Sequence, residues 1–451
     1  MVENLDTIVA IATPPGRGGI GVIRLSGTAA LGVAHKIVKR ELWPRYAHFC
    51  KFLDQEGATI DTGLAIHFPA PGSYTGEDVV EFHAHGSRPA LAMLVHRAIE
   101  LGARLARPGE FTERAFHNNR IDLIQAEAVA DLIDSVSDQA ARSAGRSLAG
   151  EFSRRINSVL GRIISLRTQV EGALDFPEED VDFLVGERLV KELNLCRSEL
   201  ESIFSVARQG AILNEGIIAV IVGRPNAGKS TLLNVLAGRE AAIVTATPGT
   251  TRDLIEQDIV LDGIPLHIID TAGLRTTRNE AEKEGIRRAM SAAETADILI
   301  VINEYRQSLS AEEHRLVNEA LPDRHVILLH NKIDLYQAEP GLENSGRNLV
   351  EINLSAKTGA GIEILTVQLK EFLGMKNIDE DVFIARRRHI DALERTRRSL
   401  YAAGDACAGK PVMELLAEHL RIAQHALGEV TGMYAADDLL GEIFSRFCLG
   451  K

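Results

Sequence analysis

The sequence predicts a multidomain α/β plus α protein, in which a doubly wound, mainly parallel sheet domain is inserted into a helical domain that follows an N-terminal α+β module. Three observations lead to this prediction. Apolar runs alternate with helical patterns in the middle of the chain, helical patterns flank that region on both sides, and short strands dominate the beginning. The expected segments are 1–118 for the α+β module, 119–212 and 377–451 for the two helical parts, and 213–376 for the inserted domain.

The N-terminal module is expected to contain a helix at 29–39 and strands at 6–11, 19–25, 64–68 and 79–85. In the strand 79–85, alternation with period two places Glu81, His83 and His85 on one face. A half-exposed strand with a polar face explains this pattern. The spacing also permits a metal site, although nothing else in the sequence supports one.

The helical parts are expected to form long helices of a bundle. The first runs from 120 to about 174 with few breaks and continues at 187–209, and the second has helices at 384–403, 412–427 and 437–447. A basic stretch falls in the first part, with arginines at 142, 146, 154, 155, 162 and 167. It fits either an RNA-facing stripe or solvated helix faces with intramolecular charge pairs.

Composition and charge set limits on function. The chain has 451 residues and a net charge of −13, which argues against nonspecific nucleic-acid binding by the chain as a whole. No uncharged run approaches the ~18 residues that span a bilayer, so we expect a soluble cytoplasmic protein without a membrane segment. The cysteines at 50, 196, 407 and 448 form no CxxC pair and no zinc spacing, so neither a disulfide framework nor a structural metal is expected.

The inserted domain begins with a phosphate-binding loop. The segment 223–231 reads GRPNAGKST, after an apolar strand at 216–222 and before a helix at 232–237, which is the context that G-x-x-x-x-G-K-[ST] requires. Its glycines let consecutive N–H groups point at phosphates. Lys229 supplies a charge for the β- and γ-phosphates, and the Ser230 hydroxyl is the expected Mg²⁺ ligand.

Three further motifs specify a guanine nucleotide. Asp270-Thr-Ala-Gly273 follows a strand at 264–269, Asn331-Lys-Ile-Asp334 follows a strand at 325–329, and Ser355-Ala-Lys357 comes later. A carboxylate at Asp334 can accept two hydrogen bonds from guanine, a donor pair that adenine lacks. The set predicts a Ras-like P-loop GTPase domain. Its predicted GTP-binding residues are Asn226, Ala227, Gly228, Lys229, Ser230, Thr231, Asp270, Thr271, Ala272, Gly273, Asn331, Lys332, Asp334, Ser355, Ala356 and Lys357.

Hydrolysis by this domain requires an unusual route. Ras-type enzymes orient the attacking water with a glutamine directly after the Asp-x-x-Gly motif. That position is Leu274 here, and an apolar side chain cannot align water. Another residue must therefore assist hydrolysis, and the nearby candidates are Arg252, Arg275 and Glu282.

With these motifs in hand, the chain resembles the MnmE (TrmE) family of tRNA-modification GTPases along essentially its full length. Besides the GTPase set, the resemblance rests on ATPPGRGG at 12–19, PGEFT at 108–112, LIQAEA at 123–128, DFPEE at 175–179 and CLGK at 448–451. It implies an N-terminal folate-binding domain that forms a homodimer, a discontinuous helical domain and an inserted G domain. It also implies that the protein works with the flavoprotein MnmG (GidA). Together they would add an aminomethyl or carboxymethylaminomethyl group to the wobble uridine of certain tRNAs, with methylene- or formyl-tetrahydrofolate as one-carbon donor.

The resemblance further assigns residues to these roles. Arg24, Glu81, Arg120 and Lys451 would contact the folate, although Arg120 stands where relatives can carry lysine. Cys448 would either take part in the modification chemistry or be a packing residue near the terminus.

For hydrolysis, the resemblance assigns Glu282 to the attacking water and replaces the arginine finger with K⁺. Asn226, Thr245, Thr247 and Thr250 would hold this K⁺, and Thr251 would join Ser230 on Mg²⁺. These four threonines are also assigned to GTP binding.

Two alternatives belong to other classes. A regulatory or ribosome-assembly GTPase would act as a binding switch without chemistry on RNA, and binding of a reduced folate would discriminate against it. A membrane-associated transport GTPase is disfavoured, since no spanning segment is apparent.

Overall fold

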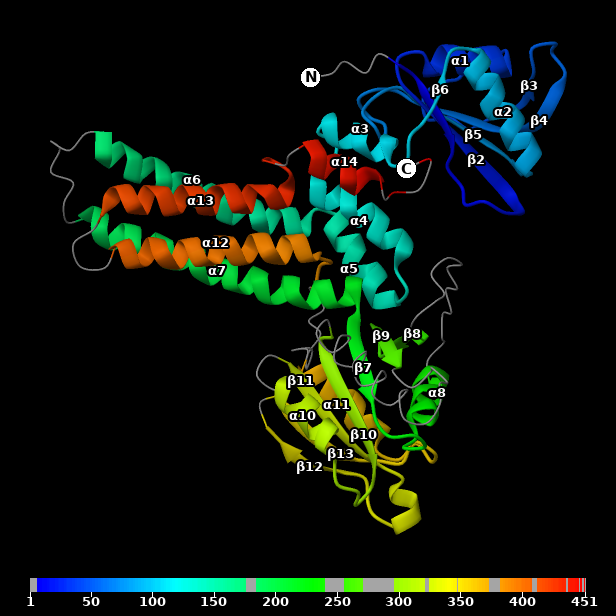
Figure 1. Cartoon of the computed structure of the whole chain (residues 1–451). Coiled ribbons are helices and arrows are strands. Elements are labelled where there is room, and N and C mark those ends of the chain that lie inside the picture. The colour runs from blue at the N-terminus through cyan, green and yellow to red at the C-terminus, as the bar shows by residue number, and fades with distance from the viewer. Residues whose placement is uncertain are drawn as a thin grey trace. The chain divides into compact units, whose positions relative to one another are not determined.

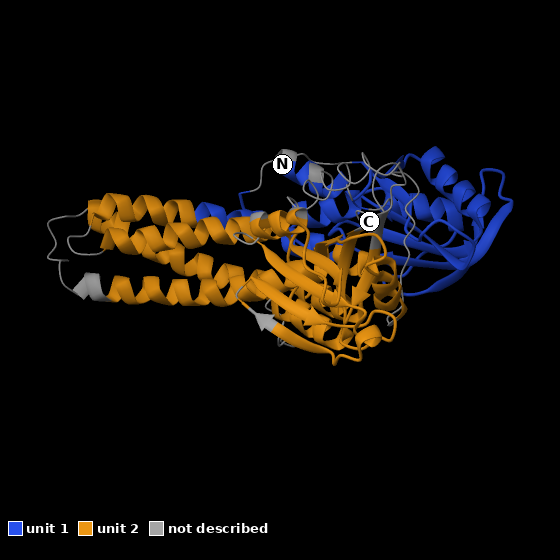
Figure 2. Cartoon of the chain, turned by 60° about the horizontal axis from the view of Figure 1, so that its bottom comes forward, with its two compact units in different colours: residues 1–130, 424–451 blue, residues 131–423 orange. Residues whose placement is uncertain are grey.

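The structure, a computed structural model, describes residues 6–175, 184–239, 255–270, 296–320, 324–346, 348–372, 382–407, 412–434, 437–445, 447 and 450. Two compact units make up the chain. Unit 1 comprises residues 1–130 and 424–451, and unit 2 comprises residues 131–423 (Figure 2).

Unit 1 contains a six-stranded sheet with the order β3-β4-β5-β2-β1-β6 (Figure 1). All neighbours are antiparallel except the β1–β6 pair. The strands are β1 (Ile8–Ile11), β2 (Gly18–Ser26), β3 (His48–Leu53), β4 (Thr59–Phe68), β5 (Val79–Gly86) and β6 (Arg104–Leu105).

One face of this sheet is covered by α1 (Ala30–Val38) and α2 (Arg88–Glu100). Side chains of β5 alternate as predicted: Val80, Phe82 and Ala84 are buried in the core under these helices, and the residues between them are half-buried or exposed. The polar face of β5 therefore lies on the side of the sheet away from α1 and α2.

The last helix of the chain packs against the segment that follows the sheet. Side chains of α3 (Glu110–His117), α4 (Leu123–Asp134) and α14 (Asp437–Ser445) share an apolar cluster that includes Phe444 and Phe447. Gly109 has a φ of 70°, and a Cβ there would lie 2.4 Å from the Phe444 carbonyl oxygen. Only glycine tolerates both conditions, which explains the glycine of the PGEFT segment.

Buried charges fasten α3 to the sheet. Arg114 is 3% exposed and donates hydrogen bonds to Asp6, Glu77 and Glu110. Arg104 donates to both oxygens of Glu110, at 2.6 and 3.1 Å. Since each buried charge has several partners, the network offsets the cost of desolvating it.

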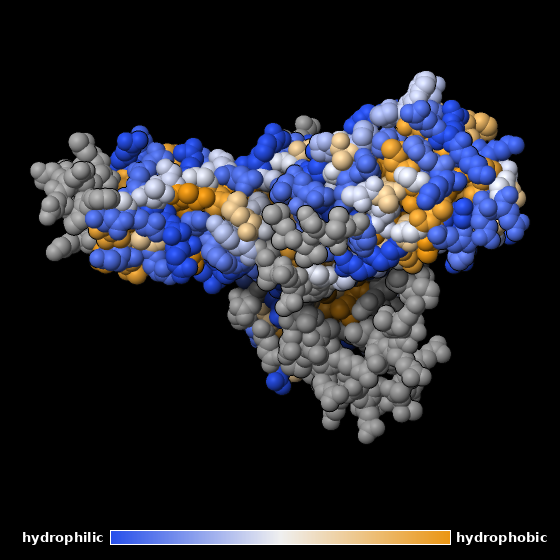
Figure 3. Space-filling view, turned by 90° about the horizontal axis from the view of Figure 1, so that it is seen from above, coloured by the Kyte–Doolittle hydropathy of each residue, from blue (hydrophilic) through white to orange (hydrophobic). Residues whose placement is uncertain are grey.

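Apolar side chains also reach the surface of unit 1. Ile20, Trp43 and Phe49 are 66, 62 and 70% exposed. In Figure 3, hydrophobic residues form separate patches among hydrophilic ones on this part of the molecule. These side chains are available for contact with another surface.

Unit 2 combines helices with a second sheet. The helices α6 (Glu151–Asp175), α7 (Leu184–Glu215) and α12 (Arg387–Cys407) lie side by side with the part of α13 (Met413–Thr431) that belongs to this unit (Figure 1). The shorter α5 (Asp138–Leu148) packs against α6 and α7. The expected long run after residue 120 is broken twice. Ser137 caps α5 by accepting a hydrogen bond from the Ala140 N–H at 3.2 Å, and Gly150 has a φ of 80° before α6.

The two helical segments that flank the second sheet in sequence pack against each other. Arg197 of α7 donates a 2.9 Å hydrogen bond to the Leu400 carbonyl of α12. At the end of α7, Glu215 accepts a hydrogen bond from the Arg387 N–H at 2.9 Å. The chain therefore leaves and re-enters the helical part at neighbouring points.

The second sheet has the order β12-β13-β11-β10-β7-β9-β8. Strands β9, β7, β10, β11 and β13 are parallel, and the edge strands β8 and β12 are antiparallel. This confirms the predicted mainly parallel sheet. The strands are β7 (Ile217–Val222), β8 (Ile255–Leu261), β9 (Ile264–Asp270), β10 (Ile298–Glu304), β11 (His325–Asn331), β12 (Gly341–Ser345) and β13 (Leu349–Asn353).

Helices α8 (Lys229–Arg239), α10 (Ala311–Ala320) and α11 (Ile362–Phe372) accompany this sheet, which has an apolar cluster on each face. Burial on both faces explains why its strands read as continuous apolar runs. Among the described residues, no helix has the combined length and apolarity needed to cross a bilayer.

Candidate nucleotide and folate sites

The loops that carry the GTPase motifs meet at one edge of the parallel sheet. The phosphate loop follows β7, Asp270 ends β9, Asn331 ends β11, and the Ser355 loop follows β13. Because these strands are parallel, their carboxyl ends lie at the same edge, where ligands bind in open α/β sheets.

A single buried amide joins three of the motifs. Asn331, 2% exposed, donates from Nδ2 to the Ala227 carbonyl at 2.7 Å and accepts at Oδ1 from the Ala356 N–H at 2.8 Å. The first contact reaches the phosphate loop and the second reaches the Ser-Ala-Lys loop. Asn331 therefore sets the spacing between the expected phosphate and guanine ends of the site.

Glycines allow the phosphate loop to approach its neighbours. A Cβ at Gly228, where φ is 105°, would lie 2.1 Å from Asn331 Nδ2, and one at Gly223 would lie 2.3 Å from the Ile302 carbonyl oxygen. Asn226 has a φ of 64°. Positive φ angles at Gly228 and Asn226 are typical of loops whose backbone N–H groups bind an anion.

The Lys229 ammonium is buried within the same loop. Its Nζ donates to the carbonyls of Gly223 and Arg224, the latter at 3.0 Å. Ser230 and Thr231 are exposed in the first turn of α8, where the helix N-terminus favours negative charge. The loop thus places one cation and one helix terminus beside two exposed hydroxyls.

At the expected guanine end of the site, Asp334 Oδ1 accepts a hydrogen bond from the Ser355 hydroxyl at 2.6 Å. Ser355 and Ala356 are fully buried, whereas Lys357 is exposed. The hydrogen bond fixes the carboxylate of Asp334 against the loop that carries the Ala356 N–H.

Glu304 is a supporting residue that sequence reasoning missed. Lys332 Nζ lies 2.8 Å from its Oε2, and the Tyr336 hydroxyl donates to its Oε1 at 3.0 Å. These hydrogen bonds, that of Lys332 first, lower the pKa of the Glu304 carboxyl. Glu304 is the last residue of the parallel strand β10. That position at the carboxyl end of the strand is the feature by which the sequence could have indicated a site residue.

Several predicted site residues lie outside the described residues, so their placement remains a prediction. They are Thr245, Thr247, Thr250, Thr251, Thr271, Ala272, Gly273, Glu282, Cys448 and Lys451. Asp270 is described only as part of β9, without its side chain.

In unit 1, Arg24 and Glu81 form an ion pair across neighbouring strands. They are register partners of β2 and β5, and both Nε and a terminal nitrogen of Arg24 lie 2.9 Å from Glu81 Oε1. The Arg24 guanidinium carbon lies 5.2 Å from the centre of the Tyr74 ring and 5.7 Å from that of Phe111. Burial raises the pKa of Tyr74. A half-buried charge pair beside two aromatic rings suits a flat ligand with both donors and acceptors.

The remaining polar residues of β5 diverge. His83 Nε2 lies 3.2 Å from Glu81 Oε2, but His85 pairs instead with Asp61, at 2.8 Å. Glu81, His83 and His85 therefore share a face without converging on one point.

The other predicted folate contacts come from distant parts of the chain. Arg120 is exposed, and its Cγ would lie 3.1 Å from a Cβ at Gly76. Gly450 is buried, and a Cβ there would lie 2.3 Å from the Ile11 carbonyl oxygen. Since Ile11 follows Ala10, the register partner of Arg24, the C-terminal segment reaches the strand beside the Arg24–Glu81 pair.

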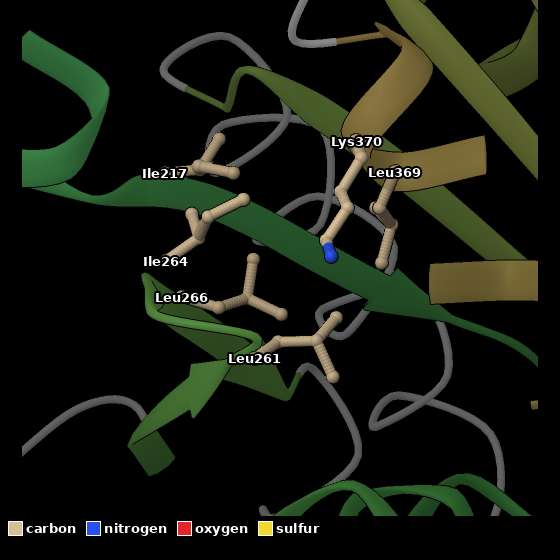
Figure 4. Close-up of a pocket in the computed structure, with 6 residues that line it drawn as sticks. All are labelled: Ile217, Leu261, Ile264, Leu266, Leu369 and Lys370. Carbon is tan, nitrogen blue, oxygen red and sulfur yellow. The ribbon is translucent and has the colours of Figure 1, made fainter. Parts of the chain in front are cut away.

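Unit 2 also has a small apolar recess, lined by Ile217, Leu261, Ile264, Leu266, Leu369 and Lys370 (Figure 4). Lys370 is paired with Asp262. The recess lies at the amino ends of β7 and β9, opposite the edge that carries the motif loops. It is therefore separate from the nucleotide site.

The described thiols are unsuited to nucleophilic chemistry. Burial raises the pKa of Cys50, Cys407 and Cys196, the last to about 11 with help from Glu199. A raised pKa keeps a cysteine protonated at neutral pH and so unreactive.

Known proteins match the chain over its whole length. The model of the MnmE helical domain matches residues 123–448, and that of the GTP-binding protein TrmE N-terminus matches residues 7–120. A protein of Pseudomonas paraeruginosa named tRNA modification GTPase MnmE is 50% identical over 455 residues, which covers 100% of both chains. Proteins of the same name from Coxiella burnetii and Hydrogenovibrio crunogenus are 48% and 47% identical and cover 99% of each chain.

Among solved structures, the G domain of the T. maritima FeoB iron transporter is 22% identical, covering 36% of this chain and 98% of that one with a TM-score of 0.25. The full-length relatives and the two domain matches, taken together, establish that the chain belongs to the MnmE (TrmE) family.

Proposed function

We propose that this protein hydrolyses GTP in the service of tRNA modification, adding an aminomethyl or carboxymethylaminomethyl group at the wobble uridine of certain tRNAs. The relatives named tRNA modification GTPase MnmE support the proposal. The observation that carries the GTPase part is the Asn331 amide, which links the phosphate loop to the guanine loop.

In this proposal the chain's own groups bind and orient the nucleotide. Lys229 transfers its hydrogen bonds from the loop carbonyls to the β- and γ-phosphates, and the backbone N–H groups near Gly228 contact the phosphate oxygens. Asp334 accepts hydrogen bonds from guanine while Ser355 holds it in place. The loss of the Lys229 hydrogen bonds to the loop carbonyls is offset by a stronger ionic hydrogen bond to phosphate.

Cations would complete the site. Ser230 and Thr251 are the residues assigned to Mg²⁺, which would neutralise charge on the phosphates. Asn226, Thr245, Thr247 and Thr250 would hold K⁺, and Glu282 would position water. The left-handed backbone at Asn226 and the exposed Ser230 hydroxyl are compatible with these roles.

Turnover in KCl and in NaCl tests the K⁺ assignment. We expect faster hydrolysis in KCl, no difference between the salts for Asn226→Ala, and slower turnover with unchanged GTP affinity for Glu282→Ala. Equal rates of the unaltered protein in the two salts would remove K⁺ from the mechanism.

The one-carbon chemistry is proposed for unit 1. Arg24, Glu81, Arg120 and Lys451 would bind methylene- or formyl-tetrahydrofolate, with Glu81 accepting from the pterin N–H donors. Support comes from the Arg24–Glu81 pair beside Tyr74 and from Gly450 against Ile11. Cys448→Ser should retain GTP hydrolysis, and its effect on modification decides between a chemical and a packing role.

The proposed assembly is a homodimer that works with the flavoprotein MnmG in the cytoplasm. The exposed Ile20, Trp43 and Phe49 provide apolar surface for such contacts. Its proposed organisation is a folate-binding module at 1–118, a helical domain in two parts at 119–212 and 377–451, and a G domain at 213–376. The hydrogen bond between Glu215 and Arg387 supports an insertion at that point.

Mass analysis of the wobble uridine in tRNA from cells lacking this protein tests the proposal as a whole. Loss of the modification, restored by the unaltered gene but not by a Lys229→Ala variant, is the expected result. If tRNA from cells lacking the protein still carries the wobble-uridine modification, and the purified protein does not bind reduced folate, a regulatory GTPase without RNA chemistry is favoured instead.

A further inference from the structure

We propose that three side chains at the edge of the second sheet form a binding site for a divalent transition metal such as Zn²⁺. His330 of β11, Glu343 of β12 and Glu351 of β13 each offer one ligand atom, and these atoms lie within 4.8 Å of one another. His330 Nε2 is 3.3 Å from Glu351 Oε2. Nothing in the proposed GTP or folate chemistry uses these residues.

A β-bulge brings the third ligand to the cluster. Along the β12–β13 pair the register shifts between Leu342 and Asn344, so that Glu343 is the extra residue. A bulge re-aims the side chain that it carries. In a regular strand, the face on which the Glu343 side chain lies would be set only by the alternation of side chains along β12.

A buried amide supports this arrangement. Asn353 is 6% exposed, and its Nδ2 donates to Glu343 Oε1 at 2.6 Å. Within the described residues its Oδ1 is buried without a hydrogen-bond partner. Asn353 is also the register partner of His330. A buried donor that orients a ligating carboxylate is typical of the residues that surround a metal.

The donor set selects the class of metal. One imidazole nitrogen with two carboxylate oxygens suits Zn²⁺, Mn²⁺ or Co²⁺ better than Mg²⁺, which prefers oxygen ligands and keeps its water. In a tetrahedral site with bonds of about 2.0–2.1 Å, ligand atoms lie about 3.3 Å apart. The His330–Glu351 pair already has this separation, and the exposed Glu343 can close the remaining distance.

The site is adjacent to the nucleotide loops in sequence. His330 directly precedes Asn331, and Glu351 lies four residues before Ser355. A bound metal would join β11, β12 and β13. We therefore expect it to raise the thermal unfolding midpoint of the full chain, since a ligand that binds only the folded state stabilises it.

Titration of the full-length protein, freed of metal by a chelator, with Zn²⁺ in competition with a chromophoric indicator tests this inference. We expect one equivalent to be lost, or weakened at least tenfold, in both His330→Ala and Glu343→Gln. Asn353→Ala should weaken the same equivalent about 10- to 100-fold as a positioning residue. His314→Ala, which removes an exposed histidine of α10, is the matched control and should bind like the unaltered protein.

Cysteines and other zinc ligands are the same in all of these proteins. A difference in bound zinc between the unaltered protein and a variant therefore reports on this site alone. Co²⁺ gives an independent readout: a visible absorption band should appear in the unaltered protein and be absent in Glu343→Gln. Glu343 is exposed, so this variant is expected to fold. Equal zinc stoichiometry and affinity in the unaltered protein and all four variants, with identical Co²⁺ spectra, would overturn the proposal and leave a hydrogen-bonded cluster only.

Discussion

The two sheets of this protein present candidate site residues in different ways. In unit 2 the residues lie in loops at the carboxyl ends of parallel strands, and Asn331 ties these loops together. In unit 1 the Arg24–Glu81 pair lies within antiparallel strands, on the face not covered by α1 and α2. A parallel sheet gathers its loops at one edge by topology alone, whereas an antiparallel sheet assembles a site only through its register.

This difference explains why sequence motifs predict the site in unit 2 but not the pairing of site residues in unit 1. Four motifs in order predict where the nucleotide site lies, because each follows a strand whose direction is known. For Arg24 and Glu81, 57 residues apart, no local pattern indicates that they are opposite each other. Substitutions of single residues in each unit test whether the two sites are built in these different ways.

The largest expected effect is on nucleotide choice. Asp334→Asn replaces an acceptor of two guanine hydrogen bonds with a group that also donates, so GTP affinity should fall by about 10²- to 10⁴-fold. Affinity for xanthosine triphosphate, whose base carries an oxygen in place of the amine, should rise. Displacement of a fluorescent nucleotide measures both. An equal loss for the two nucleotides would mean that Asp334 acts only through Ser355.

The next effect concerns the link between the loops. Asn331→Ala leaves the Ala227 carbonyl and the Ala356 N–H without their partner, at a cost of about 1–3 kcal/mol for each unsatisfied group. We expect GTP affinity to fall about 10- to 100-fold without a change in base preference. Asn318→Ala on the exposed face of α10 is the control. Unaltered affinity in Asn331→Ala would show that the loops keep their spacing without this amide.

A smaller effect is expected in the antiparallel sheet. Glu81→Gln removes the charge that Arg24 and the proposed folate share, and affinity for a reduced folate should fall about tenfold. Isothermal titration with formyl-tetrahydrofolate measures it. Asp61→Asn, which alters the neighbouring carboxylate that pairs with His85, should bind folate normally. If both variants bind equally well, the face of β5 is not the folate site.

The smallest effect concerns stability at low pH. Burial alone would raise the pKa of Glu110, but hydrogen bonds from Arg104 and the Arg107 N–H outweigh it and lower that pKa. A lowered folded-state pKa contributes stability that is present above the unfolded pKa of about 4.3 and is lost as pH falls through the folded value. Glu110→Gln should therefore cost about 1 kcal/mol at pH 7 and less near pH 3. Urea unfolding at both pH values tests this; a cost that does not change with pH would contradict it.

Much of the secondary structure could be predicted. The strand 79–85 and its alternation are confirmed by β5, and the strands before the GTPase motifs are confirmed by β7, β9 and β11. The strand β3 was missed because its buried face carries His48 and Cys50 while Phe49 is exposed. Polarity does not mark the two faces of such a strand.

The sequence by itself determined the order of the GTPase motifs, the parallel character of the sheet that carries them and the family, since local spacing and apolar patterns contain this information. Only the tertiary structure decided which distant residues meet. It placed Arg24 opposite Glu81, Gly450 against Ile11, and His330 beside Glu343 and Glu351. Register, bulges and the return of the chain terminus set these contacts, and none of them leaves a periodic trace in the sequence.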